Sequence, residues 1–335
     1  MKKAVFLGKK SSFDYVYSKE TLKKMFAEIN FPYGERVFVR EELDETDMKD
    51  IDFVFSTWGM LPLSEEEIER YLPSLKCVFY AAGSVQYFAR PFLSKGVRVF
   101  SAWAANAIPV SEYTYAQITL ANIGYYRRLH LPASGPSWSN RWASEGFGGN
   151  YETTVGIIGA GMIGSRVARL IRDNMEKVRV LVFDPFLPED RVQELRVTRC
   201  DLPTLFAQSD VITNHLANNP RTVGMLNGEM FKLMKPYATF INTGRGAQTV
   251  ESDLIEALKE VPTRTAILDV TLPEPPKPDS EFYTLPNVFL SPHIAGSMGN
   301  EVHRMAEYML DECRLYESGK PSRYEVTLKM LETMA

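Results

Sequence analysis

Short runs of consecutive apolar residues recur along the chain and alternate with segments of helical periodicity. Most of these runs are continuous rather than alternating, which is typical of parallel strands buried on both faces. Strands are expected in the first hundred residues at 4–8, 37–40, 52–56, 77–81 and 97–101, and later at 155–159, 179–184, 211–214, 239–242, 266–270 and 288–291.

Helix signals fall between these runs. Ser64 to Glu67 has the Ser-x-x-Glu form of a capping box and leads into an apolar segment that ends near Leu72. Helical spacing also covers residues 161–173, 251–258 and 300–317. Strands that alternate with helices predict βαβ units, and therefore doubly wound parallel sheets of the α/β class.

A chain of 335 residues exceeds what one hydrophobic core usually serves, so two domains are expected. A stretch without clear periodicity begins with turn-rich residues 131–136 and continues to about residue 150, with Trp138, Trp142 and Phe147 in it. We interpret this stretch as an arm that packs on a neighbouring subunit; a floppy linker with scattered aromatic residues is the alternative.

The charge balance and the cysteines narrow the class of protein. Lys and Arg number 38 against 42 Asp and Glu, so the net charge of −4 argues against a nucleic-acid partner. Cys77, Cys200 and Cys313 lack paired spacing, which predicts neither disulfides nor a metal site and suits a reducing, cytoplasmic setting. No signal-peptide core and no apolar stretch of about 18 residues is found, so no membrane association is expected.

The most specific local motif is a G-x-G-x-x-G turn placed where an apolar strand ends and a helix begins. Gly159 allows the tight turn, Gly161 lets the backbone approach a pyrophosphate, and Gly164 lets helix and strand pack closely. The first N–H groups of the helix face the phosphates. The predicted dinucleotide-binding residues of this turn are Gly159, Gly161, Met162, Ile163 and Gly164.

An acidic residue follows at the spacing that such a turn requires. Asp184 ends the next predicted strand, 184 − 164 = 20 residues beyond Gly164. A carboxylate there accepts hydrogen bonds from the ribose hydroxyls and repels a 2′-phosphate, which favours NAD over NADP. Pro185 stands where an NADP site would place Arg. The alternative is a glycine turn with an unrelated surface Asp.

Three ionisable residues follow the ends of later strands, namely Arg245, Glu274 and His293. Ligands of an open parallel sheet bind beyond the carboxyl ends of its strands, so these loops can converge. Reduction of a 2-keto acid needs a proton donor, for which His293 is suited, and a carboxylate such as Glu274 favours the protonated imidazolium. The guanidinium of Arg245 can hold the substrate carboxylate through paired donors.

Each of these residues also has a structural interpretation when taken alone. His293 can be a hydrogen-bonded structural histidine, Arg245 can pair with a carboxylate or face solvent, and Glu274 can be a solvated charge in a proline-rich loop. Their order after a dinucleotide turn favours catalysis.

With these motifs the chain resembles the D-2-hydroxyacid dehydrogenase family, which includes D-lactate, D-glycerate and D-3-phosphoglycerate dehydrogenases. The resemblance covers nearly the whole chain and is firmest from Gly156 to Gly296. It rests on the glycine turn with Asp184, on the segments 222–226, 234–236 and 241–246, on Asp269 with Glu274-Pro275, and on Ser291-Pro292-His293.

The resemblance implies roles in catalysis and cofactor binding. Asp269 matches the acid that hydrogen-bonds the nicotinamide carboxamide, and His215 and Thr243 fall in segments that line the cofactor. The matches to the family's catalytic triad are Arg245, Glu274 and His293.

It also implies a layout and a substrate site. A Rossmann cofactor domain (105–296) is expected to be inserted into a flavodoxin-like substrate domain (1–104 and 297–335). The backbone N–H groups of Ser84 and Val85 match those that hold the substrate carboxylate, and family members are typically homodimers.

The chain departs from the family pattern near the substrate site. Val85-Gln86-Tyr87-Phe88 lacks the Asp that the family commonly has there, which leaves the substrate identity open. A looser version of the Leu-His-x-Pro segment follows His215. Trp58 and Met60 follow a predicted strand and are candidates for an apolar substrate pocket, although a core tryptophan is an equal alternative.

Together these features predict an NAD-dependent oxidoreductase acting on a small 2-hydroxy or 2-keto acid. A dinucleotide-sensing scaffold that acts through partner proteins is the alternative from another class. A third possibility within the same fold is a formate- or phosphite-type dehydrogenase. Formate enzymes of this fold pair their histidine with Gln, so Glu274 disfavours this possibility.

Overall fold

The computed structural model describes residues 1–129 and 146–332. The chain divides into two compact units: unit 1 is Met1–Ala107 with Ser297–Ala335, and unit 2 is Ile108–Gly296. The division at Ala107 falls within the long helix α5 (Trp103–Asn122). Within the described residues, no helix combines the length and apolar character that crossing a membrane requires.

Unit 1 is built on a six-stranded sheet in the order β13-β5-β4-β3-β1-β2. Strands β1 to β5 are parallel and follow the flavodoxin-like order, whereas β13 is antiparallel to β5. The strands are β1 (Ala4–Leu7), β2 (Val37–Phe38), β3 (Phe53–Ser56), β4 (Cys77–Tyr80), β5 (Arg98–Ser101) and β13 (Glu325–Val326).

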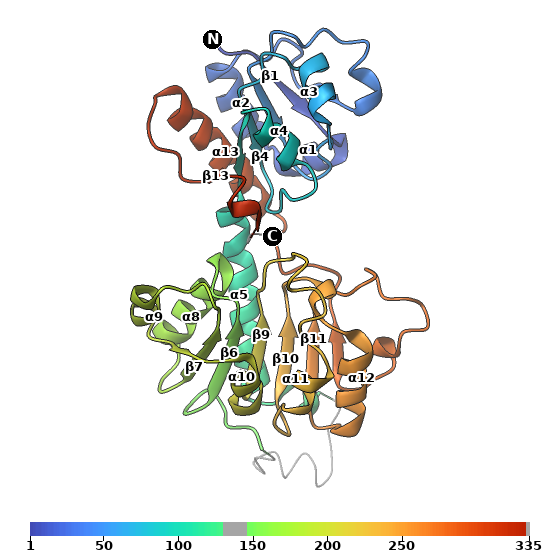
Figure 1. Ribbon diagram of the computed structural model, residues 1–335, viewed down its shortest axis with the longest axis vertical. Coiled ribbons are helices and arrows are strands. Elements are labelled where there is room, and N and C mark those ends of the chain that lie inside the picture. Colours follow the sequence, from blue (N-terminus) through green and yellow to red (C-terminus); the bar gives the residue numbers. More distant parts are fainter. Residues whose placement is uncertain (130–145, 333–335) are drawn as a thin grey trace. The chain divides into compact units, whose positions relative to one another are not determined.

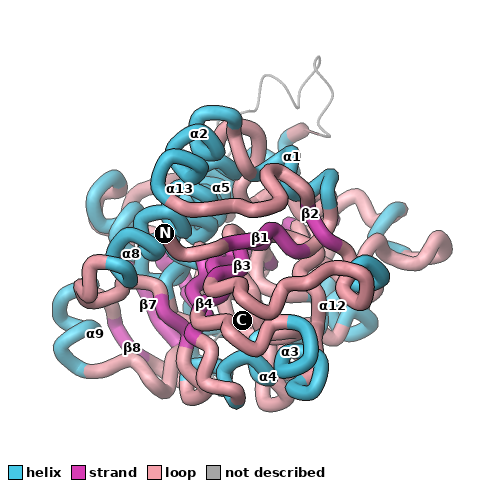
Figure 2. Tube along the Cα trace, turned by 90° about the horizontal axis from the view of Figure 1, so that it is seen from above, coloured by secondary structure: helices cyan, strands magenta, loops and turns pink. Residues whose placement is uncertain are grey.

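Helices cover both faces of this sheet because its strands are apolar on both sides. Phe6 and Phe55 belong to the core under α1 (Lys10–Val16), α2 (Lys19–Glu28) and α13 (Glu301–Glu317), which lie on one face (Figure 2). Val54 and Val78 belong to the core under α3 and α4 on the other face (Figure 2). The bounds are α3 (Glu65–Tyr71) and α4 (Ala89–Ser94), and the 3-10 helices are η1 (Arg40–Glu42) and η4 (Met330–Glu332).

Unit 2 is built on a seven-stranded parallel sheet in the order β12-β11-β10-β9-β6-β7-β8 (Figure 1). This order reverses between β6 and β9, as in a Rossmann sheet, and ligands bind at such a reversal. The strands are β6 (Thr154–Ile158), β7 (Arg179–Phe183), β8 (Thr198–Arg199), β9 (Val211–Asn214), β10 (Thr239–Asn242), β11 (Thr265–Leu268) and β12 (Val288–Leu290).

Helices pack on both faces of this sheet as well. One core joins α5 and α8 (Met162–Asn174) to the sheet through Ile118 and Val167. The other joins α10, α11 and α12 through Phe206, Phe231 and Leu254. The remaining bounds are α6 (Tyr125–Arg128), α9 (Glu189–Leu195), α10 (Leu202–Gln208), α11 (Gly228–Lys232), α12 (Glu251–Glu260), η2 (Gly246–Gln248) and η3 (Glu281–Tyr283).

The two doubly wound sheets confirm the predicted fold class. A strand is present at each predicted position, with its ends moved by at most a few residues, and the sequence pattern missed only the two-residue strands β8 and β13. Most of the expected aromatic arm, with Trp138 and Trp142, lies outside the described residues. Phe147 is described, and its ring packs edge-on against Tyr237 of unit 2 at 5.4 Å between centroids. Packing of the arm on another subunit stays a prediction.

Candidate functional site

The glycine turn connects β6 to α8 at the point where the strand order reverses. Gly159 adopts a φ of +86°, a left-handed conformation that favours glycine. A Cβ on Gly164 would lie 2.0 Å from the carbonyl oxygen of Gly159, so this helix position must stay small. A Cβ on Gly161 would meet nothing within 4 Å, so space is open outside the turn.

Asp184 holds this turn from the end of β7. Its Oδ2 accepts a hydrogen bond from the N–H of Ala160 at 2.8 Å, and its Oδ1 accepts one from the N–H of Phe186 at 2.9 Å. The carboxylate therefore lies beside the glycine turn, where the sequence predicted it, and it also fixes the backbone there.

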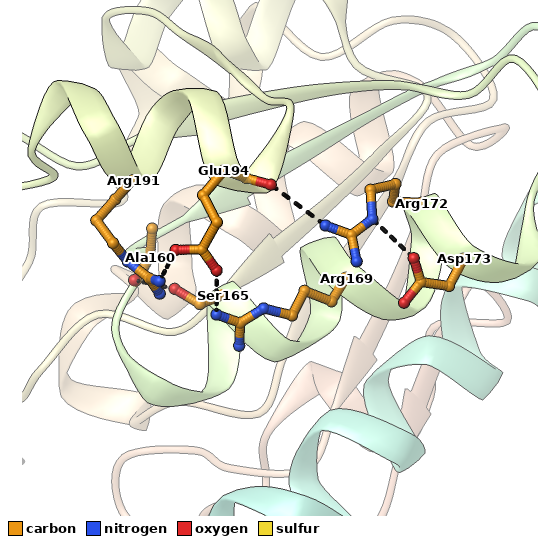
Figure 3. A network of polar contacts seen from close by, with 7 residues as sticks. All are labelled: Ala160, Ser165, Arg169, Arg172, Asp173, Arg191 and Glu194. Atoms are coloured by element: carbon orange, nitrogen blue, oxygen red, sulfur yellow. Dashed lines mark hydrogen bonds and ion pairs between the residues drawn. The ribbon is translucent and has the colours of Figure 1, made fainter.

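Polar contacts also hold the start of α8 (Figure 3). The hydroxyl of Ser165 donates to the carbonyl oxygen of Ala160 at 2.6 Å. Glu194 on α9 pairs with Arg169 on α8 at 2.8 Å and with Arg191 on its own helix. These ion pairs are solvent-exposed, so each contributes on the order of 1 kcal/mol or less; the Ser165 contact is the one that shapes the turn itself.

His215 lies against the glycine turn. A Cβ on Gly159 would come within 2.8 Å of the His215 carbonyl oxygen, and the His215 N–H donates to Ile158 at 2.7 Å. Its ring nitrogens contact the hydroxyls of Thr213 at 3.0 Å and Thr243 at 3.4 Å. Burial lowers the pKa of His215 to about 3, so the ring is neutral near pH 7.

A buried amide network carries the loop after β10. Asn214 Nδ2 donates to Asn242 Oδ1 at 3.0 Å and to Gln248 Oε1 at 2.6 Å. The same two oxygens accept the backbone N–H groups of Gly244 and Arg245. The sequence analysis did not single out Asn214 or Gln248; the available signal was an amide at the end of an apolar strand, where a buried polar side chain must have partners.

Arg245 extends from this loop. Its Nη1 donates to the carbonyl oxygen of Gly244 at 2.7 Å, and the residue is partly exposed. Burial lowers the pKa of the guanidinium, and the negative charge of Glu274 opposes that shift. The guanidinium therefore lies within electrostatic range of Glu274 and keeps donor capacity for an anionic ligand.

His293 and Glu274 form a direct pair. His293 Nδ1 lies 2.6 Å from Glu274 Oε1, and the two side chains are 47% and 41% exposed. His293 has a φ of +54°, a strained conformation for a residue other than glycine. Strain of this kind persists only where neighbouring contacts hold the backbone in place.

Asp269 supplies those contacts. Its side chain is buried at 2% exposure, and its carboxylate accepts hydrogen bonds from Ser291 Oγ at 2.6 Å and from the N–H groups of Ile294 and Ala295 at 2.9 Å each. Its carbonyl oxygen accepts the N–H of His293 at 3.0 Å. Among the described residues, every hydrogen-bond donor to the Asp269 carboxylate therefore belongs to the loop that carries His293.

The loop that carries Glu274 has an anchor of its own. Glu251, the first residue of α12, accepts the N–H of Leu272 at 2.7 Å, and burial raises the pKa of this carboxyl. Glu251 was not among the residues predicted from the sequence. An acidic residue at the start of a helix is ordinarily a surface residue whose negative charge interacts favourably with the helix dipole. The sequence alone therefore offered no signal for this contact.

The predicted substrate residues belong to unit 1, at the carboxyl ends of its strands. Ser101 Oγ donates to the carbonyl oxygens of Ala82 at 2.8 Å and Gly83 at 2.6 Å, which turns these carbonyls inward. Among the described residues, no hydrogen bond is found from the backbone N–H groups of Gly83, Ser84 and Val85. These N–H groups are thus available to an anion, while the Val85 side chain is buried.

Trp58 and Met60, expected together in a pocket, have different surroundings. Trp58 is 37% exposed and is therefore not a core tryptophan. Met60 is 2% exposed and packs in the core beside α3 and α4, so the expectation that it faces a substrate pocket is wrong. The described residues contain no group of three or more His, Cys, Asp or Glu arranged to hold a metal ion.

Comparison with known proteins places this arrangement in a family. Residues 127–295, half of the chain, match the model of the D-isomer specific 2-hydroxyacid dehydrogenase NAD-binding domain. The chain is 31% identical over 240 residues to the D-3-phosphoglycerate dehydrogenase of Archaeoglobus fulgidus, which covers 71% of the chain and 44% of that protein. It is 36% identical over 171 residues to the glycerate dehydrogenase of Methylorubrum extorquens, which covers 50% of the chain and 51% of that enzyme.

Solved structures agree on the fold. The D-mandelate dehydrogenase of Rhodotorula graminis superposes with a TM-score of 0.79 at 19% identity, over 97% of each chain. The chain thus spans about half the length of the curated relatives it matches, whereas its fold extends over 97% of a solved neighbour. From the family match, the chain belongs to the D-isomer specific 2-hydroxyacid dehydrogenase family, and residues 127–295 match the NAD-binding domain of that family.

Proposed function

We propose that this protein transfers a hydride between NAD and a small 2-hydroxy or 2-keto acid. The observation that carries the proposal is the 2.6 Å contact between His293 and Glu274, with Arg245 within electrostatic range of the same carboxylate. An acid/base histidine, its carboxylate partner and a guanidinium at the carboxyl edge of one sheet are the groups that this chemistry needs.

The residues around the glycine turn fit a dinucleotide. The open space at Gly161 admits a pyrophosphate, and the first N–H groups of α8, at Met162, Ile163 and Gly164, receive no side-chain cap from Gly161. Asp184 is the proposed ribose ligand, and its charge is the reason we propose NAD rather than NADP. When bound, the cofactor supplies or accepts the hydride.

Three further residues are proposed to line the cofactor. His215, which is neutral, lies against the glycine turn, and Thr243 contacts its ring at 3.4 Å. Asp269 is the proposed partner of the nicotinamide carboxamide, a role assigned by family resemblance. Its buried carboxylate is already engaged by the His293 loop, so we propose that positioning this loop is also part of its function.

The acid/base step is assigned to His293. In reduction, the protonated imidazole gives its proton to the substrate carbonyl oxygen as negative charge develops there, and in oxidation it takes the hydroxyl proton. Glu274 at Nδ1 stabilises the imidazolium and orients the ring so that the other nitrogen faces the substrate. Arg245 is proposed to bind the substrate carboxylate and polarise the carbonyl oxygen.

In unit 1, the backbone N–H groups of Ser84 and Val85 are the proposed donors to a substrate carboxylate. They are supported by their position after β4 and by the absence of other acceptors for them among the described residues. Trp58 is proposed as a contact of the substrate side chain.

A spectrophotometric panel tests the proposal. Purified protein is offered 2-keto acids with NADH and, in parallel, with NADPH, and absorbance at the nicotinamide band is followed. We expect turnover with at least one keto acid and faster turnover with NADH. Tight NADH binding without turnover on the whole panel would contradict the proposal and favour a dinucleotide-sensing protein.

A further inference from the structure

Two large aromatic side chains of unit 1 lie together on its surface. Tyr15 on α1 is 42% exposed and Trp58, after β3, is 37% exposed. Their ring centroids are 6.4 Å apart at an interplanar angle of 25°, a loosely stacked arrangement. Single exposed apolar residues are ordinary, but two adjacent, partly exposed rings leave an apolar patch that water solvates poorly.

The residues on either side of Trp58 have restricted conformations. The residue before it, Thr57, donates its hydroxyl to the carbonyl oxygen of Ala81 at 2.8 Å. The residue after it, Gly59, has a φ of +90°, and a Cβ there would lie 2.9 Å from Cβ of Lys9. The chain on both sides of Trp58 is therefore fixed, and the ring points away from the core.

Tyr15 is held by a polar contact rather than by apolar burial. Its hydroxyl oxygen accepts the N–H of Gly299 at 2.9 Å. By contrast, the neighbouring aromatic residues of the chain, Phe13 and Tyr17, are 3% exposed and belong to the core. The two exposed rings are thus held in place while their surface stays free.

The pair lies beside the predicted carboxylate-binding loop. The Thr57 contact to Ala81 places the residue before Trp58 beside the segment that leads to Gly83, Ser84 and Val85, whose N–H groups make no hydrogen bond among the described residues. A 2-keto acid carries a carboxylate on one side of its carbonyl and its variable side chain on the other. The segment with Trp58 and the donor-rich loop follow the neighbouring parallel strands β3 and β4, so an aromatic surface and a carboxylate-binding loop at the same edge of the sheet match those two ends.

We propose that Tyr15 and Trp58 bind the side chain of an aromatic 2-keto acid, and that the protein prefers such substrates to pyruvate. This inference rests on the proposed function, because it assigns the substrate class of the same site. Contact of a substrate ring with two aromatic side chains strengthens binding by roughly tenfold over a methyl group.

Steady-state kinetics test the preference with phenylpyruvate, pyruvate and 3-phosphohydroxypyruvate, each with NADH. Phenylpyruvate is expected to have the highest kcat/KM, roughly tenfold or more above pyruvate. Trp58→Ala and Tyr15→Ala should each lower kcat/KM for phenylpyruvate by about tenfold and lower that for pyruvate by a clearly smaller factor, because a methyl group offers the two rings little contact surface. Trp58→Phe and Tyr15→Phe keep a ring and should retain most of the preference.

Tyr151→Ala is the matched control, because it removes a ring that is 45% exposed in unit 2 and precedes β6, at the amino end of that strand. It should leave all three substrates unchanged. A preference for pyruvate or for the phosphorylated acid, or an equal loss on all substrates in Trp58→Ala, would overturn the inference.

Equilibrium binding separates this inference from the proposed function. Calorimetric titration of a keto acid into protein with NAD⁺ involves no reaction, since both partners are oxidised. Tighter binding of phenylpyruvate than of pyruvate, lost in Trp58→Ala, supports the aromatic site even if the panel shows no turnover. Turnover with equal affinity for phenylpyruvate and pyruvate would refute the aromatic site but not the proposed reductase activity. Absence of both binding and turnover would refute the aromatic site and the reductase activity together.

Discussion

Asp269→Asn tests whether the strained His293 depends on one buried carboxylate. The substitution keeps the size of the side chain and removes its charge. Asn Oδ1 can still accept from Ser291 Oγ and from the N–H of Ile294, but its NH2 group would face the N–H of Ala295, which now donates at 2.9 Å to Oδ2. One of three hydrogen bonds is lost, and a buried N–H is left without an acceptor.

The expected cost follows from these contacts. A hydrogen bond to a charged acceptor contributes about 1.5–3 kcal/mol, so we expect a loss of about 2 kcal/mol of folding free energy. For a unit of this size the corresponding fall in Tm is roughly 4–8 °C. If about 2 kcal/mol of the stabilisation that holds His293 in its catalytic position is lost in the transition state, kcat falls by about thirtyfold.

The assays are calorimetry for Tm, steady-state kinetics for kcat and KM, and fluorescence titration for the Kd of NADH. Ser291→Ala is the comparison variant, because it removes the 2.6 Å hydroxyl bond but keeps the charge and both N–H contacts. It should lower kcat by a smaller factor. An Asp269→Asn protein with unchanged kcat and a strongly raised Kd for NADH would refute the positioning role and leave only the carboxamide contact.

The remaining predictions concern the cofactor side of the site. Gly164→Ala should lower Tm and NADH affinity together, because its Cβ would lie 2.0 Å from the Gly159 carbonyl oxygen. Gly161→Ala should lower NADH affinity in a fluorescence titration without changing Tm, because its Cβ would have no protein atom within 4 Å. Asp184→Ser should raise the ratio of kcat/KM for NADPH over NADH by about tenfold or more in parallel assays, because no carboxylate remains to repel a 2′-phosphate. Burial lowers the pKa of His215 to about 3, so below about pH 6.5 the unfolded chain takes up a proton that the folded chain does not. Urea titrations should therefore show stability lost as the pH falls from 6.5 towards 3, by at most about 1.4 kcal/mol per pH unit from this group, and His215→Gln should flatten that slope. A slope that survives the substitution would assign the effect to other groups.

Much of the fold was predictable because apolar runs buried on both faces leave a strong pattern. The continuous runs located β6 and β9 to β11 within a residue or two, and the Gly-x-Gly-x-x-Gly spacing located the turn. β8 and β13 were missed because each has only two residues and neither forms an apolar run, whereas β2, equally short, is made of Val37 and Phe38. Short edge strands of this kind depend on their neighbours in the sheet.

The sequence allowed single functional groups to be proposed for the site, but not the residues that support them. Arg245, Glu274 and His293 stood out as ionisable residues after strand ends. Asn214 and Glu251 did not, because an amide or an acid becomes a support only through partners distant in sequence, here Gln248 at 34 positions and Leu272 at 21. Exposure of Trp58 likewise depends on packing that no local pattern encodes.

The central claim, that His293 is the acid/base group of a 2-keto acid reductase, is tested most directly by His293→Asn. Asn tolerates the left-handed conformation that His293 adopts at φ +54°, so the loop should keep its shape. With a keto acid that the unaltered protein reduces, kcat should fall by about 10²–10⁴-fold while the Kd of NADH stays within about twofold. Turnover that remains within a few fold of the original at unchanged NADH affinity would contradict the account.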